Sequence, residues 1–424
     1  MEEKRHLKRL EKTLLPRMVT TSNLIFDRSQ TLLDVIEADV ARTFPNNKEF
    51  QEVQTKNEQL RAELRKSRWP ELRHFSSNGR NYILPLRAES RDSSLLPSEP
   101  KLAYLAGFFD GDGCVSCQVN LSGCVLQVGQ SFDQAEILML FYETFGGSIR
   151  LEKGGLGLCK PLLCWKACGQ SARRAAQLLA PQSITKREQL LLAAQWPTAR
   201  CHRTECSAEL RALKEYDSAV AAPCSWEYFA GFFDAEGNVD QQLGTATLVL
   251  RITQKHPQVL KCLREFLARR LGKGGTFAKS GESLHVLRVC GLTSCQHIMQ
   301  QLLAAGLLRK AKQAKLVLGL TSERAAQVSS ELGHLAGNQK FGRRLDTAGQ
   351  ERARKIRNAQ GQAARLKRRG QVAEAIAKLG EVEVLKEEHQ LLKACRENQQ
   401  LLEYMHRLQS LQDNSLDGRF AQGR

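Results

Sequence analysis

Two carboxylate residues, Asp112 and Glu236, stand at matching places in two copies of one nonapeptide. The copies occupy residues 105–113 and 229–237, and corresponding positions are 124 residues apart. Two carboxylates held side by side repel each other unless a cation lies between them. Mg²⁺ accepts such oxygen ligands together with water and phosphate oxygens, and a metal ion stabilises the entering and leaving oxygens of a displacement at phosphorus. The pair therefore predicts metal-dependent phosphodiester hydrolysis, provided that the two copies meet.

Each nonapeptide is predicted to form a short apolar helix that ends at a glycine. An Ala-Gly pair at 106–107, and again at 230–231, leaves one side of each helix without bulky side chains, so two such backbones can approach closely. Packed about a pseudo-twofold axis, the helices bring their C-terminal ends, and hence both acids, together. Asp110 and Asp234 lie two residues earlier, on another side of the helix, and are predicted to hold local backbone.

Two further residue types keep register with the acids. Gln130 and Gln254 each lie 18 residues after the acid of their own copy, and Lys186 and Lys310 each lie 74 residues after it. Four such residues in register are hard to ascribe to surface composition. An ancient duplication would also keep this register after activity was lost, so the spacing alone leaves both interpretations open.

The nonapeptides resemble the motif of the LAGLIDADG homing endonucleases, in the single-chain form with two motifs, over roughly residues 100–320. The resemblance implies two αββαββα repeats that form an antiparallel β saddle over duplex DNA, with Asp112 and Glu236 as ligands of Mg²⁺. It also implies that Gln130, Gln254, Lys186 and Lys310 order or activate the attacking water. Glu236 departs from the more usual aspartate, and the turns near 122 and 244 are short for the family.

Hydrophobic alternation supports this α+β fold independently of the resemblance. Polar and apolar residues alternate over 114–121 and 124–130, which predicts two half-buried strands after the first motif helix. Further strands are predicted at 148–153, 162–168, 275–279 and 284–290. Helical spacing of apolar residues separates the strand pairs, so both repeats are predicted to run α-β-β-α-β-β-α.

The polar faces of these strands fit the reading of duplex DNA, because a two-stranded ribbon can enter the major groove and present side chains to base edges. A plain solvent-exposed face would also be polar, and the two interpretations stay open. The side chains with the right parity or position are Gln118, Asn120, Gln127, Asn238, Gln242, Thr247 and Arg251, with Lys166 and Arg288 on the outer strands.

Composition points to a polyanionic partner. The 424 residues carry a formal net charge of +18, and an excess of Lys and Arg favours nucleic acid through counterion release, although a generally adhesive basic protein would share it. No apolar run is long enough for a membrane span, and the charged N-terminus lacks the apolar segment of a secretory signal. The 13 cysteines are scattered, and Cys114 and Cys117 are predicted to be strand cysteines rather than zinc ligands.

The predicted organisation is an N-terminal helical extension and linker (1–97), two repeats (98–196 and 225–325) joined by a connector (197–224), and a C-terminal extension (335–424). Residues 340–369 contain eleven Lys or Arg and two acids. Residues 372–411 are predicted to form one long helix, either in a coiled coil or packed on the protein.

The predicted function is site-specific double-strand DNA cleavage, dependent on Mg²⁺, at a long asymmetric target, by a monomeric core. The resemblance also implies intron homing, because genes of the family commonly lie in introns or inteins. Two alternatives stay open on the same scaffold. One is an RNA-binding intron-splicing cofactor, or maturase, and the other is a DNA-binding protein that does not cleave. The helical extensions are candidate sites for a protein partner, and no membrane partner is expected.

Overall fold

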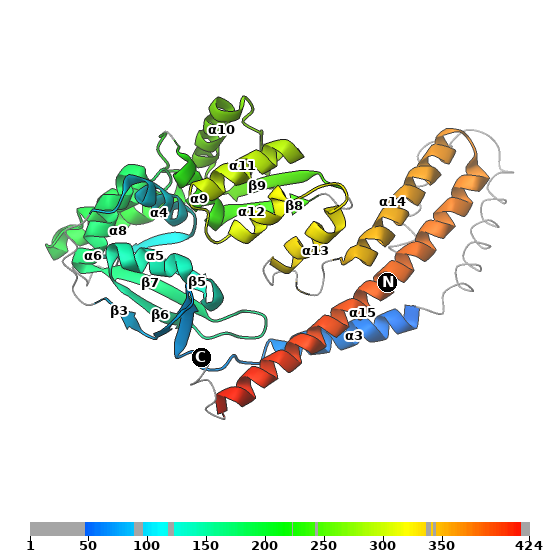
Figure 1. Cartoon of the computed structure of the whole chain (residues 1–424), viewed down its shortest axis with the longest axis horizontal. Coiled ribbons are helices and arrows are strands. Elements are labelled where there is room, and N and C mark those ends of the chain that lie inside the picture. Colours follow the sequence, from blue (N-terminus) through cyan, green and yellow to red (C-terminus); the bar gives the residue numbers. More distant parts are fainter. Residues whose placement is uncertain are drawn as a thin grey trace. The chain divides into compact units, whose positions relative to one another are not determined.

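The computed structural model describes residues 47–88, 96–117, 123–222, 224–241, 245–335, 341 and 345–416 (Figure 1). The chain divides into two units, residues 1–54 and residues 55–424. Helix α3 (Asn47–Leu64) contains the end of the first unit and the beginning of the second. The helices predicted before residue 47 lie outside the described residues. No helix in the described ranges is long and apolar enough to cross a membrane.

The predicted order of elements is confirmed in both repeats. The first repeat comprises α4 (Glu99–Asp112), β4 (Gly113–Cys117), β5 (Cys124–Ser131), α5 (Glu136–Phe145), β6 (Ser148–Lys153), β7 (Leu162–Cys168), α6 (Gly169–Leu179) and α7 (Arg187–Ala194). After α8 (Arg200–Glu215), the second comprises α9 (Trp226–Glu236), β8 (Gly237–Gln241), β9 (Leu248–Gln254), α10 (Pro257–Leu271), β10 (Thr276–Ser280), β11 (Leu284–Cys290), α11 (Leu292–Ala304) and α12 (Ala311–Leu318).

Each repeat has its own antiparallel sheet, with strand orders β3-β6-β7-β5-β4 and β10-β11-β9-β8, where β3 (Leu86–Arg87) precedes the first repeat in the chain. Side chains alternate along β5, where Leu126 and Val128 are fully buried while Gln127 is half-buried. The buried face packs against helices of the same repeat, and the polar side chains therefore lie on the other face. The α+β class with antiparallel sheets is confirmed, whereas the joining of the two sheets into a saddle on DNA stays a prediction.

The segment before the first repeat differs from the sequence prediction of a helical extension and linker. Residues 74–87 contain the hairpin of β1 (His74–Ser77) and β2 (Arg80–Ile83), followed by β3 (Leu86–Arg87). Leu86 pairs with Ile149, so β3 extends the first sheet beyond β6. Strands of two to four residues give too little alternation for a sequence pattern to reveal them, because their register is set by the sheet that they join.

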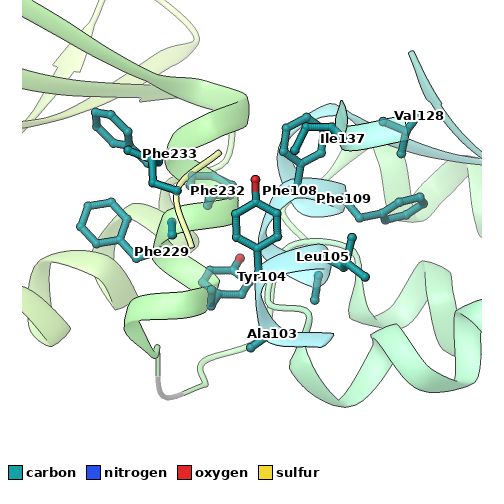
Figure 2. Packing of buried hydrophobic residues seen from close by; sticks show 14 of the residues in the cluster. Ala103, Tyr104, Leu105, Phe108, Phe109, Val128, Ile137, Phe229, Phe232 and Phe233 are labelled. Carbon is teal, nitrogen blue, oxygen red and sulfur yellow. The ribbon is translucent and has the colours of Figure 1, made fainter. Parts of the chain in front are cut away.

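The centre of the fold is the contact between α4 and α9. A Cβ atom on Gly107 would overlap the carbonyl oxygen of Tyr228, and one on Gly231 would overlap that of Tyr104. The glycines therefore let the two backbones touch. Figure 2 shows Leu105 and Phe109 on the side of α4 away from α9, and Phe229 and Phe233 on the side of α9 away from α4. Both helices are apolar all round because each buries one side in its own repeat and the other in the contact.

Beyond the second repeat, the described residues form α13 (Ala325–Leu335), α14 (Thr347–Arg368) and α15 (Val372–Leu416). Helix α15 packs on α14 through Val382, which is buried with Ile356 and Ala359. It also packs on α3, where Leu64 and Leu401 are buried together. The long helix predicted from residue 372 is confirmed, and its environment is that of a packed helix within the chain.

Candidate active site

The predicted convergence of the two motif helices is confirmed. A Cβ atom on Gly111 would overlap the side chain of Ala235 and come within 3.1 Å of Cγ of Glu236. The last turns of α4 and α9 are therefore in contact, and the negative charge of Asp112 contributes to raising the pKa of Glu236. Two carboxylates from different repeats meet at this junction, as the repeat predicted.

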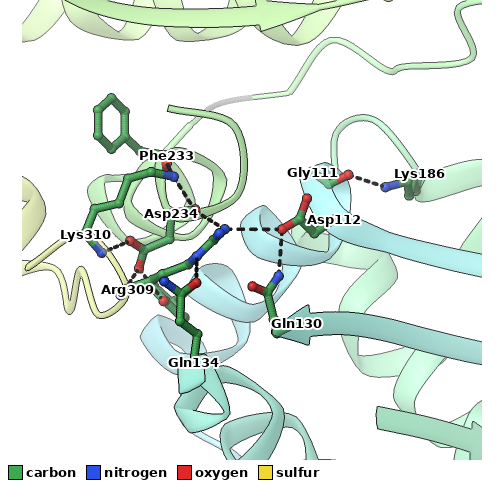
Figure 3. A network of polar contacts seen from close by, with 10 residues as sticks. Gly111, Asp112, Gln130, Gln134, Lys186, Phe233, Asp234, Arg309 and Lys310 are labelled. Atoms are coloured by element: carbon green, nitrogen blue, oxygen red, sulfur yellow. Dashed lines mark hydrogen bonds and ion pairs between the residues drawn. The ribbon is translucent and has the colours of Figure 1, made fainter. Parts of the chain in front are cut away.

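Asp112 is held by two side chains (Figure 3). Gln130, at the end of β5, donates a hydrogen bond from Nε2 to Oδ2 of Asp112 over 2.8 Å. Nη1 of Arg309 lies 3.6 Å from the same oxygen. Burial raises the pKa of the Asp112 carboxyl, and the charge of Arg309 and the Gln130 hydrogen bond oppose that rise. The folded protein therefore disfavours the charged form of Asp112 despite the two donors.

Glu236 has a related environment without the arginine. Burial is the largest cause of its raised pKa, the charge of Asp112 is the next, and a hydrogen bond from Gln254 opposes both. Each carboxylate thus has a glutamine partner from its own repeat, and each is destabilised in its charged form. A cation placed between them would reverse that effect.

The two predicted lysines lie beneath the helix ends. Nζ of Lys186 donates hydrogen bonds to the carbonyl oxygens of Phe109 and Asp110, both over 2.7 Å, and to that of Gly111 over 3.2 Å. Nζ of Lys310 donates to Phe233 over 2.8 Å and to Asp234 over 2.5 Å.

Each ammonium therefore satisfies carbonyls that the last helical turn leaves without partners, at the negative end of the helix dipole. Burial lowers the pKa of Lys186, and it lowers that of Lys310 to about 8. A role for these lysines in ordering the attacking water stays a prediction.

Asp110 and Asp234 are buried anchors, as predicted. Asp234 accepts hydrogen bonds from the backbone N–H groups of Leu308, Arg309 and Lys310. It thereby fixes the loop that begins α12 and carries Lys310. Oδ2 of Asp234 also accepts a hydrogen bond from the hydroxyl of Tyr104 in the other repeat, over 2.6 Å.

The first repeat makes the reciprocal contact. Asp110 accepts from the backbone N–H groups of Ile184, Thr185 and Lys186, and from the hydroxyl of Tyr228 over 2.7 Å. Each motif helix thus positions the lysine of its own repeat and is tied to the opposite repeat by a tyrosine. Tyr104 and Tyr228 are in register at 124 residues apart, so a full comparison of the repeats would have revealed them.

Arg309 was missed from the sequence because the repeat breaks there, with Thr185 at the matching position of the first repeat. Its Nε donates to Oε1 of Gln134 over 2.6 Å, and its Nη1 to the carbonyl oxygen of Asp234 over 3.2 Å. The guanidinium thereby crosses from the second repeat to Asp112 in the first (Figure 3). The sequence indicates this residue only by the difference between Arg309 and Thr185 at matching positions of the two repeats.

The candidate DNA-facing residues form one polar row on each sheet. Gln127 pairs in register with Lys166, and Arg251 pairs with Asn238 on one side and Arg288 on the other. Cross-strand partners share one face, so each row lies opposite the buried side of its sheet.

Two cations of these rows already have partners. Lys166 pairs with Glu152 over 2.6 Å, and Arg251 pairs with Asp240 over 2.7 Å. Thr247 is exposed just before β9. Gln118, Asn120 and Gln242 lie outside the described residues. Contact of any of these residues with DNA stays a prediction.

The donor set at the helix ends fits Mg²⁺. Among the described residues, no cluster of three or more His, Cys, Asp or Glu could hold a metal ion. Asp112 and Glu236 supply two carboxylates whose charged forms are disfavoured without a cation. Mg²⁺ commonly takes one or two carboxylates and completes its coordination with water and substrate phosphates, so it needs no all-protein cage.

Comparison with known proteins gives one family match and a set of similar structures. Residues 224–302 match the model of the LAGLIDADG-like domain. No curated protein sequence matches the chain. Among solved structures, the LAGLIDADG meganuclease I-AabMI bound to uncleaved DNA is 16% identical with a TM-score of 0.40, and the match covers 55% of this chain and 98% of that one.

Two other solved structures show a similar level of likeness. I-SmaMI bound to cleaved DNA is 16% identical with a TM-score of 0.41, over 59% of this chain and 99% of that one. I-GzeII in complex with a DNA target is 14% identical with a TM-score of 0.39, over 55% and 96%.

The family match contains the second nonapeptide, the Glu236 end of α9 and the strands that follow it. The first repeat has the same elements in the same order, and its nonapeptide lies in register 124 residues earlier. Residues 224–302 are therefore similar to a LAGLIDADG-like domain, and the nonapeptide of that domain occurs a second time at residues 105–113.

Proposed function

We propose that the chain is a site-specific double-strand DNA endonuclease that hydrolyses phosphodiester bonds with Mg²⁺ at a long asymmetric target. The observation that carries this proposal is the meeting of Asp112 and Glu236, each with the in-register glutamine of its own repeat beside it. Two acids that raise the free energy of the fold when charged have little structural value, and a cation that gathers both explains why they are placed together.

In this proposal, the acids, glutamines and lysines of the site have different roles. Asp112 and Glu236 would hold the ion, and Gln130 and Gln254 would orient the two carboxylates by hydrogen bonds. Lys186 and Lys310 fix the helix ends and place positive charge beneath the site. When bound, Mg²⁺ would polarise a phosphoryl oxygen and supply a nucleophilic water at neutral pH.

The residue types of the two polar rows support the same proposal. Gln127 and Asn238 offer amide groups of the kind that pair with adenine, and Arg251 and Arg288 offer the forks that pair with guanine. The rows differ between the repeats, so the two half-sites are expected to differ in sequence. The pairing of Arg251 with Asp240 would hold the guanidinium in a defined direction before DNA arrives.

Cleavage of a random-duplex plasmid library in Mg²⁺ tests the proposal. The wild type should linearise a subset of plasmids that share one sequence, and chelation by EDTA should stop the reaction. Asp112→Asn and Glu236→Gln should each abolish double-strand cleavage. Glu388→Gln, which removes an exposed carboxylate on α15, should leave it unchanged. Absence of cleavage by the wild type, or equal cleavage by Asp112→Asn, would contradict the proposal.

One observation favours a second candidate, a DNA-binding protein that does not cleave. The guanidinium of Arg309 already compensates part of the charge of Asp112. The repulsion between the two acids therefore needs less compensation by a metal ion. Sequence-specific DNA binding that survives both EDTA and Asp112→Asn, without nicking, would establish this candidate. Binding of intron RNA without binding of duplex DNA would instead indicate the splicing cofactor.

A further inference from the structure

The two C-terminal helices differ strongly in charge. Helix α14 carries seven Lys or Arg and a single acid, Glu351. Helix α15, which packs against it, carries acids along its whole length. The basic residues of the C-terminal extension are therefore concentrated on one helix of an antiparallel pair, where they create a local positive field.

Four arginines of α14 form a stripe on its exposed side. Arg354, Arg357, Arg365 and Arg368 are all exposed, and at 3.6 residues per turn they fall within an arc of about 80°. The buried residues Ile356, Ala359 and Ala363 lie on the opposite side, where Ile356 and Ala359 meet Val382 of α15. The contact with α15 thus directs the stripe away from that helix.

The stripe has no acidic partners. Among the described residues, none of the four guanidiniums lies in an ion pair with a carboxylate; Arg365 donates only to the carbonyl oxygen of Gly361, over 3.2 Å. At a rise of 1.5 Å per residue, the stripe consists of two arginine pairs roughly 16 Å apart. Such spacing fits an extended row of phosphates better than a single phosphorylated ligand.

We propose that the Arg354, Arg357, Arg365 and Arg368 stripe of α14 binds the phosphate backbone of duplex DNA outside the sequence-reading sheets, and adds affinity that does not depend on sequence. The proposal rests on the proposed function for its choice of duplex DNA as the partner. Bidentate guanidinium–phosphate contacts suit this array, and phosphate contacts position a protein without specifying bases.

Other partners fit the stripe less well. A membrane-surface helix needs large apolar side chains free on its other face, whereas most apolar residues of α14 are alanines and the large Ile356 is buried with Val382 of α15. A protein interface has a core of aromatic or aliphatic anchors. Between the two arginine pairs, the exposed residues of the stripe face are instead Asn358, Gly361 and Ala364.

The test measures binding of the full chain to a duplex DNA that lacks any cleaved site, across a range of salt concentrations. The stripe variant replaces Arg354, Arg357, Arg365 and Arg368 by Gln. The matched control replaces Lys378, Lys386, Lys393 and Arg407 of α15 by Gln, and removes the same charge. The stripe variant should reduce the magnitude of the slope of log K against log salt by about 3.6, at roughly 0.9 for each of the four phosphates that the protein no longer neutralises. The control should lower it by less than about 1.

Equal slopes for the stripe variant and the control would overturn the proposal. So would an effect seen with an RNA duplex of the same sequence and absent with DNA, because the stripe would then serve RNA. Circular dichroism of both variants checks that the helices are intact. Cleavage at the selected target is scored separately, so failure of the stripe proposal, with cleavage intact, is distinguishable from failure of the endonuclease proposal.

Discussion

Arg309 is the residue at which the two halves of the site differ in charge. It brings a guanidinium to within 3.6 Å of Asp112, while Thr185 takes its place in the first repeat. The pseudo-twofold axis therefore relates two acids with unequal surroundings. In an endonuclease, this asymmetry would separate the metal requirements of the two strand cuts.

We expect Arg309→Thr to increase metal affinity, because a guanidinium and Mg²⁺ compete for the same carboxylate oxygen. The gain should be about two- to fivefold, which is the range of a partly exposed ion pair. Mg²⁺ titration of plasmid nicking and calorimetric Ca²⁺ binding to the DNA complex both measure it. Lys312→Thr removes an equal charge from an exposed position on α12, and an identical shift in that control would contradict a direct role for Arg309.

The buried Lys310 makes stability depend on pH. Its pKa is about 8 in the folded protein, against about 10.4 for a free lysine. The unfolded chain therefore binds more protons between these values, so this residue makes the fold more stable as pH rises through that window. Lys310→Met should remove about 1 kcal/mol of this rise between about pH 7 and about pH 9.

Urea unfolding of wild type and variant at both pH values measures the difference. Burial raises the pKa of Cys164 and Cys295 to about 11, which lowers stability at high pH, but the variant shares those cysteines. If the change in the free energy of unfolding between the two pH values were the same in Lys310→Met as in the wild type, Lys310 would have an ordinary pKa in the folded protein.

At the scale of elements, the contact of α4 with α9 decides whether a site exists. The carbonyl oxygens of Tyr228 and Tyr104 occupy the space that a Cβ atom on Gly107 and Gly231, respectively, would need. The reciprocal bonds from Tyr104 to Asp234 and from Tyr228 to Asp110 then fix the two helices in one register. The glycines therefore allow the two helices to approach closely, and the tyrosines fix their alignment along each other.

We expect Gly107→Ala to cost about 3 kcal/mol or more, because the new methyl group meets a backbone carbonyl that cannot rotate away. Gly361→Ala, in the exposed middle of α14 with nothing within 4 Å of the new atom, should instead stabilise by about 0.5–1 kcal/mol. Denaturant unfolding curves give both values. A loss of under about 1 kcal/mol for Gly107→Ala would show that the helices can separate without penalty.

At the scale of the whole molecule, the chain outside the repeats has its own small cores. Leu64 of α3 packs with Leu401 and Leu408 of α15. Asn57 donates from Nδ2 to the carbonyl oxygen of Ala394, over 2.9 Å. These contacts join segments more than 300 residues apart in sequence, so the part of α3 from Asn57 to Leu64 belongs to the same packed unit as α15.

Leu401→Ala tests this arrangement. Leu401 is fully buried, whereas its neighbour Leu402 is 40% exposed. The first substitution should cost about 2–4 kcal/mol by leaving a cavity, and Leu402→Ala should cost less than about 1 kcal/mol. Amide hydrogen exchange of α3 and α15 measures the loss locally. Equal losses for the two leucines would show that the α3–α15 contact does not form in solution.

The repeat, the order of elements and the register of the acids, glutamines and lysines all followed from the amino-acid sequence alone. These features depend on local periodicity and on register along the chain, and both survive in a linear sequence. The strand bounds 148–153, 162–168 and 284–290 agree with the structure for this reason. The structural roles of Asp110 and Asp234 also followed, because their position on the helix separates them from Asp112 and Glu236.

The contacts that cross between repeats became visible only in three dimensions. Arg309 reaches Asp112 through space, and no period relates the two residues. The lysines proved to bind helix carbonyls, and the short strand β3 took its register from β6. The partners of Arg309, the two lysines and β3 depend on where the folded chain places a charge, an unsatisfied carbonyl or a sheet edge. That placement is a property of packing, which residue types and spacing alone do not record.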